Sequence, residues 1–142
     1  MTNRSAPWAG IVPVLAVGDV PRAVAWYTGV LGLVEHVRIR RAHRVQLGID
    51  GERAELIVRE VRDDEDVSSV TSEVMLRVAD VDGVLEEARV GGADADDGAR
   101  DWPYGERQAS FVDPFGHRWV LTQTLRDVDP VEWGGETVVH RR

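Results

Sequence analysis

Hydrophobic and polar residues follow two periods in the first half of the chain, and these predict a strand, a helix and three more strands. A continuous apolar run at 11–17 (IVPVLAV) is typical of a buried strand. Asp19 is a suitable N-cap and Pro21 is tolerated in the first turn, so a helix is expected next, ending at Gly32. Three further strands are then expected, at about 33–40, 43–49 and 53–59.

The same order of elements returns after a charged connection at 60–66 (EVRDDED). Residues 73–92 give a strand, an aspartate, a helix and a glycine, with Asp80 as the second N-cap. The segment 93–106 reads as loop with at most one short strand. The turn Asp113-Pro-Phe-Gly then joins the last two strands, expected at about 107–113 and 117–123.

A weak internal repeat relates the two halves. At an offset of 61 residues, VLAVGDV (14–20) lies on MLRVADV (75–81), with leucine, valine, aspartate and valine coinciding. Each half therefore reads as a βαβββ module, at 11–60 and 72–123. We expect one α+β domain over 11–123, with an arm at 1–10 and a tail at 124–142.

Composition restricts the function classes. The chain of 142 residues suits one domain, and its net charge of −8 argues against nucleic acid as a partner. It has no cysteine, and all 17 of its basic residues are arginine, which excludes disulfides, thiolate nucleophiles and lysine Schiff bases. No apolar run approaches the ~20 residues of a membrane helix, and no secretory leader is evident. We expect a cytoplasmic protein without a membrane partner.

Two stretches resemble the vicinal oxygen chelate superfamily, which includes glyoxalase I, extradiol dioxygenases and bleomycin-resistance proteins. VLAVGDVPRAVAWYTGVLGL (14–33) is similar to the first strand and helix of that superfamily, and PYGERQASFVDPFGHRW (103–119) to its final hairpin. The resemblance covers roughly 11–123. It implies two paired βαβββ modules that form a curved mixed sheet around a concave ligand cleft, commonly in a homodimer.

Strand alternation indicates which side chains face that cleft. Leu76 and Val78 share an apolar face that should pack under the helices, which puts Glu73 and Arg77 on the concave side. The correspondence of the two hairpins sets Glu55 on Val120, and we assign both to the cleft. Trp119 falls on the helix-facing side.

The resemblance also implies four metal-ligand positions, and these hold Val12, Glu55, Glu73 and Val120. Valine cannot bind a cation, so no cofactor is expected, and Glu55 and Glu73 are the only metal candidates, for Mg²⁺ or Mn²⁺. The four histidines are interpreted as surface or hydrogen-bonding residues. Alternatives for the two glutamates are ion pairing with Arg53 or Arg77, or contact with a cationic or hydrogen-bonding ligand.

Aromatic residues precede the seventh expected strand. PYGER (103–107) resembles the bleomycin-resistance stretch in which an aromatic residue stacks on the drug, and Tyr104 has that position, with Trp102 nearby. The alternative is that both rings pack the loop onto the sheet. The basic cluster RIRRAHR (38–44) is interpreted either as a phosphate patch or as a charged hairpin tip that discourages edge pairing, with the second favoured.

These residues lead to a functional hypothesis with a rival. The first is a metal-independent, small-molecule (antibiotic-like) binding protein, with the ligand, planar or cationic, held by Glu55, Glu73, Arg77, Trp102 and Tyr104. The rival is a divalent-metal-dependent lyase, isomerase or dioxygenase that uses Glu55 and Glu73. A third reading is an association module with an empty cleft.

Overall fold

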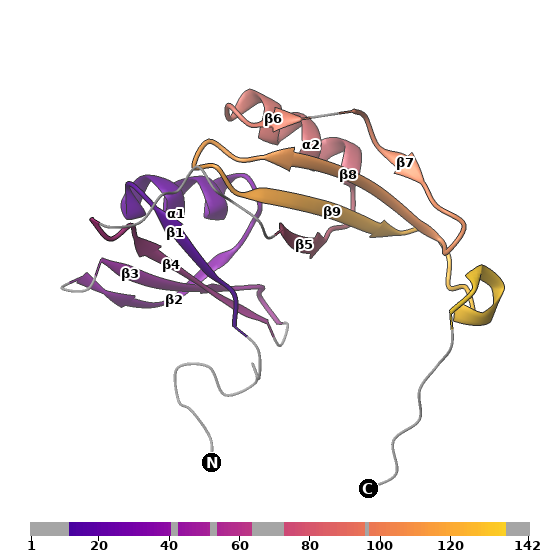
Figure 1. The fold of residues 1–142 in the computed structure, drawn as a ribbon, viewed down its shortest axis with the longest axis horizontal. Helices are drawn as coiled ribbons and strands as arrows, with labels where there is room; N and C mark the ends of the chain where they lie inside the picture. Colours follow the sequence, from indigo (N-terminus) through magenta and orange to yellow (C-terminus); the bar gives the residue numbers. More distant parts are fainter. Residues whose placement is uncertain (1–11, 41–42, 52–53, 64–72, 96, 136–142) are drawn as a thin grey trace, which may run out of the picture.

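A computed structural model describes residues 12–40, 43–51, 54–63, 73–95 and 97–135 (Figure 1). The expected arm at 1–10 and the end of the tail lie outside these ranges. In chain order the elements are β1 (Val14–Val17), α1 (Val20–Gly29), β2 (Val34–Ile39), β3 (Arg44–Gly48), β4 (Glu55–Glu60), β5 (Glu73–Arg77), α2 (Val81–Val90), β6 (Asp94–Ala95), β7 (Arg100–Asp101), β8 (Glu106–Val112), β9 (Arg118–Thr124) and the 3-10 helix η2 (Pro130–Trp133). Neither described helix has the length and apolar character needed to span a membrane.

Each half of the chain forms its own mixed sheet. The first sheet has the order β1-β4-β3-β2 and the second β5-β9-β8-β6, with β7 also pairing with β8. In both, the first strand of the module runs parallel to the last, as β1 does to β4 and β5 to β9, and the other pairs are antiparallel. The α+β fold of two βαβββ modules is therefore confirmed.

The second module contains two short strands where the sequence predicted at most one. Asp94–Ala95 pairs with Val112 and Phe111, and Arg100–Asp101 pairs with Gln108 and Arg107. Strand β8 is 7 residues long, which leaves room for both short strands along one of its edges. Each is only two residues long, too short to show a strand period, so the loop-like composition of the segment did not reveal them.

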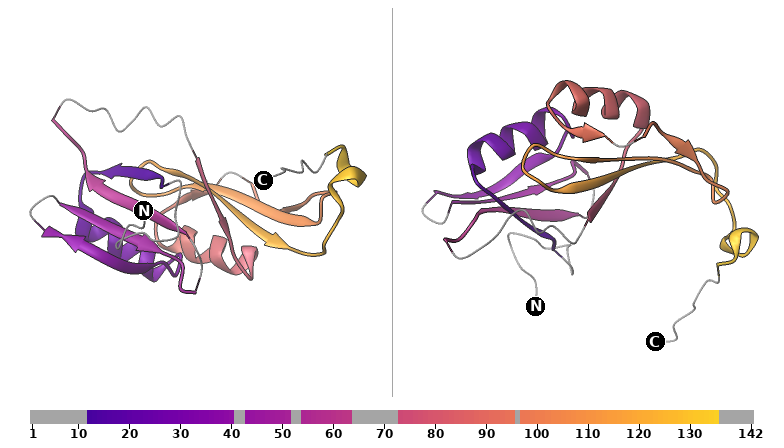
Figure 2. Two further views of the ribbon diagram at one scale, coloured as in Figure 1. Left: turned by 90° about the horizontal axis from the view of Figure 1, so that it is seen from below. Right: turned by 45° about the horizontal axis from the view of Figure 1, so that its top comes forward.

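Both helices lie on the same side of the two sheets (Figures 1 and 2). Each begins at its predicted cap: Arg22 N donates to Asp19 Oδ1 at 3.0 Å, and Gly83 N donates to Asp80 Oδ1 at 3.2 Å. Helix α1 ends at Gly29, three residues before Gly32. Gly32 adopts the left-handed φ of 71°, which lets the chain turn there.

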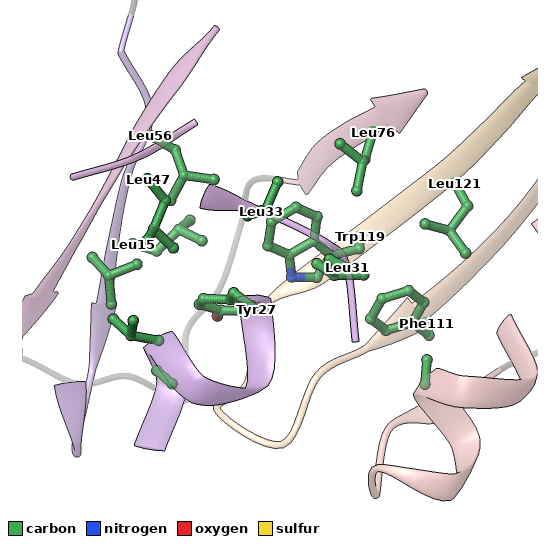
Figure 3. Packing of buried hydrophobic residues seen from close by; sticks show 14 of the residues in the cluster. Leu15, Tyr27, Leu31, Leu33, Leu47, Leu56, Leu76, Phe111, Trp119 and Leu121 are labelled. Carbon is green, nitrogen blue, oxygen red and sulfur yellow. The ribbon is translucent and has the colours of Figure 1, made fainter. Parts of the chain in front are cut away.

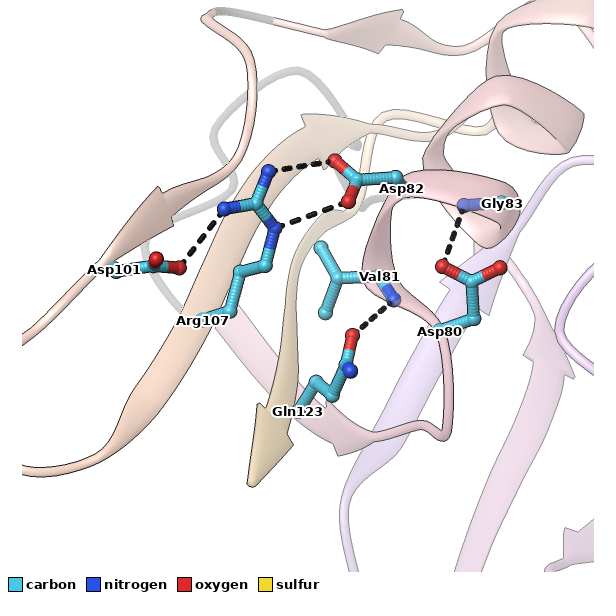
Figure 4. Close-up of polar contacts among 7 residues, drawn as sticks. All are labelled: Asp80, Val81, Asp82, Gly83, Asp101, Arg107 and Gln123. Carbon is cyan, nitrogen blue, oxygen red and sulfur yellow. Dashed lines mark hydrogen bonds and ion pairs between the residues drawn. The ribbon is translucent and has the colours of Figure 1, made fainter. Parts of the chain in front are cut away.

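Helix α2 is fixed to the second sheet by polar contacts at its first turn (Figure 4). The side-chain oxygen of Gln123 accepts a hydrogen bond from Val81 N at 3.0 Å. Arg107 donates to both carboxylate oxygens of Asp82, at 3.0 and 3.1 Å, and to Asp101 at 2.8 Å. Gln123 and Arg107 therefore mark the helix-covered face of β9 and β8, and the residues that alternate with them mark the helix-free face.

One hydrophobic core joins the two modules (Figure 3). Trp119 of β9 is fully buried, as are Phe111 of β8 and Tyr27 of α1. The rings of Tyr27 and Trp119 are 5.3 Å apart between centroids, although the first belongs to module one and the second to module two. The predicted helix-facing position of Trp119 is confirmed.

A buried carboxylate, Asp113, organises the junction between the modules. Its Oδ2 accepts hydrogen bonds from the Tyr27 hydroxyl at 2.6 Å and from Trp119 Nε1 at 2.9 Å. Its Oδ1 accepts from the backbone N–H groups of Phe115 and His117, at 2.8 and 2.9 Å. Burial, and then the charge of Asp113, raise the pKa of Tyr27 far above its ordinary value, so its hydroxyl remains a donor.

These four bonds explain the Asp-Pro-Phe-Gly turn. Asp113 closes the turn through its own backbone neighbours and at the same time holds α1 through Tyr27. His117 adds a contact to the first module, since its Nε2 lies 2.6 Å from the carbonyl oxygen of Ala16. The last hairpin is thus the piece that attaches one module to the other.

We predict that Tyr27→Phe lowers the free energy of unfolding by about 1.5–3 kcal/mol, because a buried bond to a charged acceptor is lost. Asp113→Asn should cost more, since its amide N–H₂ would face the donors of Tyr27 and Trp119. Urea denaturation followed by circular dichroism measures both. Tyr104→Phe is the matched control; it removes a half-buried neutral bond and should cost about 1 kcal/mol or less. Equal effects for the two tyrosines would contradict this account.

Candidate functional site

The helix-free face of the second sheet carries the first group of candidate residues. Strand register sets Arg77 of β5 beside Thr122 of β9, and Thr122 beside Gln108 of β8. Val120 pairs with Met75 on the same face. Arg77 and Val120 therefore lie on the face predicted from the sequence, which is the face away from α2.

A hydrogen-bonded row crosses this face. The Tyr104 hydroxyl donates to Gln108 Oε1 at 3.0 Å, and Gln108 Nε2 donates to Thr122 Oγ1 at 3.1 Å. Thr122 in turn donates to Glu106 Oε1 at 3.3 Å. We call Tyr104, Gln108, Thr122, Glu106 and Arg77 the polar row. It links two residues singled out in the sequence, Tyr104 at one end and Arg77 at the other.

At the far end of the polar row, Arg77 Nη1 contacts Glu106 Oε1 and Thr124 Oγ1. Burial alone would raise the pKa of Glu106, but the hydrogen bonds from Arg77 and Thr124 outweigh it and hold that pKa below its ordinary value. Glu106 is consequently ionised at neutral pH and balances the charge of Arg77. The Arg77–Glu106 pair therefore adds no net charge to this part of the face.

Aromatic rings stand beside Tyr104. The rings of Trp102 and Tyr104 are stacked, with centroids 6.0 Å apart and planes 8° from parallel. The guanidinium carbon of Arg100 lies 4.3 Å from the centroid of Trp102, and Trp133 meets Tyr104 edge-on at 5.7 Å. We call Arg100, Trp102, Tyr104 and Trp133 the aromatic cluster. Both Trp102 and Tyr104 are half-buried, so part of each ring stays accessible.

Gly105 makes the approach of the tail possible. Its φ of 83° is in the left-handed region, and a Cβ there would lie 2.3 Å from the carbonyl oxygen of Arg126. Leu125 N donates to Gly105 O at 2.8 Å, and this bond holds the start of the tail, which leads to Trp133, against the loop of Gly105. The sequence did not predict the part played by Trp133, because the tail has no periodicity.

Glu55 lies elsewhere, in a cavity of about 230 Å³ lined mostly by apolar side chains such as Leu33, Leu76 and Trp119. It is 7% exposed, and its Oε1 is 2.8 Å from His36 Nδ1. Its Oε2 is buried, and no group in the described part of the chain bonds to it. A buried carboxylate oxygen without a hydrogen-bond donor lowers the stability of the fold, and it marks this cavity as a second candidate site.

The partner of Glu55 differs from both arginines considered in the sequence. Arg77 pairs with Glu106, and Arg53 lies outside the described residues. His36 pairs with Glu55 instead. Strand β2 has a register shift between Glu35 and Val37, and this shift directs the side chain of His36 toward Glu55. Gly48 makes room for the ring: a Cβ there would lie 2.5 Å from His36 Cε1. The hydrogen-bonding interpretation of His36 is confirmed.

The five predicted ligand residues therefore fall into different places. Arg77, Trp102 and Tyr104 share the helix-free face of the second sheet. Glu55 lines a separate cavity, to which β5 contributes Val74, Met75 and Leu76, and Glu73 is not part of the lining. Glu73 lies on the same helix-free face as Arg77, as predicted, and is exposed at the start of β5 beside Arg118 of β9.

The donor set does not fit a bound metal. Two of the four positions at which the resemblance implies ligands are Val12 and Val120, and the two carboxylates, Glu55 and Glu73, do not line one cavity. Within the described ranges, no three histidine, aspartate or glutamate side chains are grouped so as to hold a metal ion. We derive no chemistry through a metal at these residues.

Two βαβββ modules, each with a mixed sheet and one helix, define the fold class of this protein. The model of the Glyoxalase/Bleomycin resistance protein/Dioxygenase superfamily matches residues 10–121. The chain belongs to this superfamily.

Solved structures with the same fold include TioX from Micromonospora sp. ML1, which is 29% identical, with a TM-score of 0.64 over 82% of this chain and 99% of that one. TnmS3, an antibiotic-binding protein from Streptomyces sp. CB03234, is 24% identical, with a TM-score of 0.65 over 82% and 98%. Among curated relatives, the uncharacterised protein Rv0887c of Mycobacterium tuberculosis (strain H37Rv) is 38% identical over 56 residues. That match spans 39% of this chain and 33% of the relative.

We predict that Glu55→Met raises the free energy of unfolding by about 1–2 kcal/mol, because it replaces a buried, half-satisfied carboxylate with an apolar side chain of similar length. Thermal and urea unfolding measure the change. Glu60→Met, an exposed position on the same strand, is the control and should change stability by about 0.5 kcal/mol or less. A loss of more than about 1 kcal/mol in Glu55→Met would show that the carboxylate serves the fold instead.

Proposed function

We propose that this protein binds a small planar molecule without a metal ion and without a chemical step. The observation that carries the proposal is the stack of Trp102 on Tyr104, both half-buried, at the end of the polar row. Flat rings with accessible surface favour a flat ligand, and stacking adds about 0.5–1.5 kcal/mol beyond area burial.

The polar row would orient such a ligand. Tyr104 joins the stack through its ring and the row through its hydroxyl, so the two parts of the site are held together. Gln108 and Arg77 offer N–H donors, and Glu106 offers an ionised acceptor. Binding sites for small molecules commonly combine apolar or aromatic surface with a few placed polar groups, which is the composition seen here.

The fold is compatible with sequestration of an antibiotic-like compound, since TnmS3 is an antibiotic-binding protein with this architecture. The rival hypothesis, a divalent-metal-dependent lyase, isomerase or dioxygenase, needs Glu55 and Glu73 at one centre, and the two do not line one cavity. Elemental analysis of protein purified without chelator distinguishes the two. Homodimerisation, which the family resemblance implies, stays a prediction.

We predict saturable binding of at least one planar cationic compound, tested by calorimetry with bleomycin, ethidium and acridine orange. Tyr104→Leu should weaken that binding about 3- to 10-fold because the stacked ring is lost, whereas Tyr104→Phe keeps the ring and should stay within about twofold. EDTA treatment should leave the affinity unchanged.

The outcome that counts against the proposal is the absence of saturable binding with all three compounds. Equal affinity in Tyr104→Leu and the unmodified protein would also contradict it, because the ligand would then bind away from the aromatic cluster. Stoichiometric metal in the purified protein, lost in both Glu55→Gln and Glu73→Gln, would favour the enzyme instead.

A further inference from the structure

A larger cavity, of about 500 Å³, lies on the helix-bearing side of the first module, between α1 and the hairpin of β2 and β3. We call it the α1 groove. Its floor consists of buried side chains, Val20 and Val24 of the helix and Val45 of β3. Because α1 covers the helix-bearing side of the first sheet, this groove is separate from the polar row and the aromatic cluster on the second sheet.

The groove exists because β2 presents charged residues to the helix side. Strand register pairs Glu35 with Leu47 and Arg38 with Val45, so two charged side chains share the face that is apolar on β3. Charged groups are costly to cover, and Glu35 and Arg38 remain partly or largely open to solvent. Helix α1 thus packs over the apolar strands and leaves a space above β2.

The rim of the groove carries more positive than negative charge. Hydrogen bonds from Arg38, one of them 2.7 Å long, hold the pKa of the Glu35 carboxyl below its ordinary value, so that pair is neutral overall. Arg40 and Arg44 add two further guanidinium groups, and His43 lies between them in the chain. This local excess is opposite in sign to the net charge of −8 on the whole chain.

We infer that the α1 groove binds an amphipathic monoanion, a carboxylate with an aliphatic or aromatic body. The apolar body lies on Val20, Val24 and Val45, and the carboxylate lies at Arg40 and Arg44. The volume is within the range of about 300–1,000 Å³ that small-molecule sites occupy. The apolar floor is what distinguishes this site from a plain phosphate patch.

The net charge of the chain and the size of the groove both argue against a polyanion. An acidic chain repels a nucleic acid over most of its surface, and a groove of about 500 Å³ takes one small molecule. The basic cluster at 38–44, interpreted from the sequence as a phosphate patch or a hairpin tip, thereby gains a specific role. That role does not depend on the function proposed for the second sheet.

The test uses the full-length protein and three probes with the same chain length: decanoate, decanol and decyltrimethylammonium. Methyl NMR should show decanoate shifting the resonances of Val20, Val24 and Val45, with decanoate binding more tightly than decanol and decyltrimethylammonium binding least. The double variant Arg40→Gln/Arg44→Gln should weaken decanoate binding about tenfold and leave decanol within about twofold. Arg89→Gln, a surface arginine on α2, is the matched control.

A second variant acts from the helix side. Ala25 is exposed on α1 and lines the groove, so Ala25→Glu should lower decanoate affinity through repulsion without disturbing the core. Shifts confined to the helix-free face of the second sheet would overturn the inference, as would equal affinities for decanoate and decanol. Tyr104→Leu should leave decanoate binding unchanged, which separates this result from the fate of the proposed function.

Discussion

The carboxylate of Asp113 is the interaction on which the rest of the structure depends. One buried group accepts four hydrogen bonds, two from its own turn and two from the side chains of Tyr27 and Trp119. A buried charge of this kind is stable only when its acceptor positions are filled. Because Tyr27 comes from the first module and Trp119 from the second, filling them requires the two modules to meet in one arrangement.

That arrangement decides which surfaces remain open. With Trp119 and Leu121 turned into the core, the alternate residues of β9, Val120 and Thr122, face the other way. Both α-helices lie on the core side of the sheets (Figure 1), so neither α1 nor α2 covers the opposite face of the second sheet, which carries the polar row and the aromatic cluster. The α1 groove lies on the helix-bearing side. There β2 presents charged residues instead of apolar ones, so α1 does not pack against that strand.

Features that depend on neighbours in the chain could be predicted from the sequence. The caps Asp19 and Asp80, the repeat of the two modules and the inward position of Trp119 all follow from short-range patterns, and each is found in the structure. The side of Arg77 followed from alternation, and that of Val120 from alternation together with the correspondence of the two hairpins. These are properties that a period of 2 or 3.6 residues encodes directly.

Features that depend on distant contacts could not be predicted. Tyr27 and Asp113 are 86 residues apart, and no sequence pattern around either residue indicates that they are in contact. The bulge that places His36 beside Glu55 interrupts the alternation of β2, so the sequence did not identify this histidine as the partner of that glutamate. Trp133 reaches Tyr104 through a tail with no period, held by the left-handed backbone of Gly105.

We conclude that Asp113 makes the two modules one cooperative unit. Native-state hydrogen exchange tests it most directly, by comparing the opening free energies of slowly exchanging amides in α1 and β9. We expect one common value in the unmodified protein and separate values in Asp113→Asn. Opening of α1 at a free energy more than about 2 kcal/mol below that of β9 in the unmodified protein would contradict it.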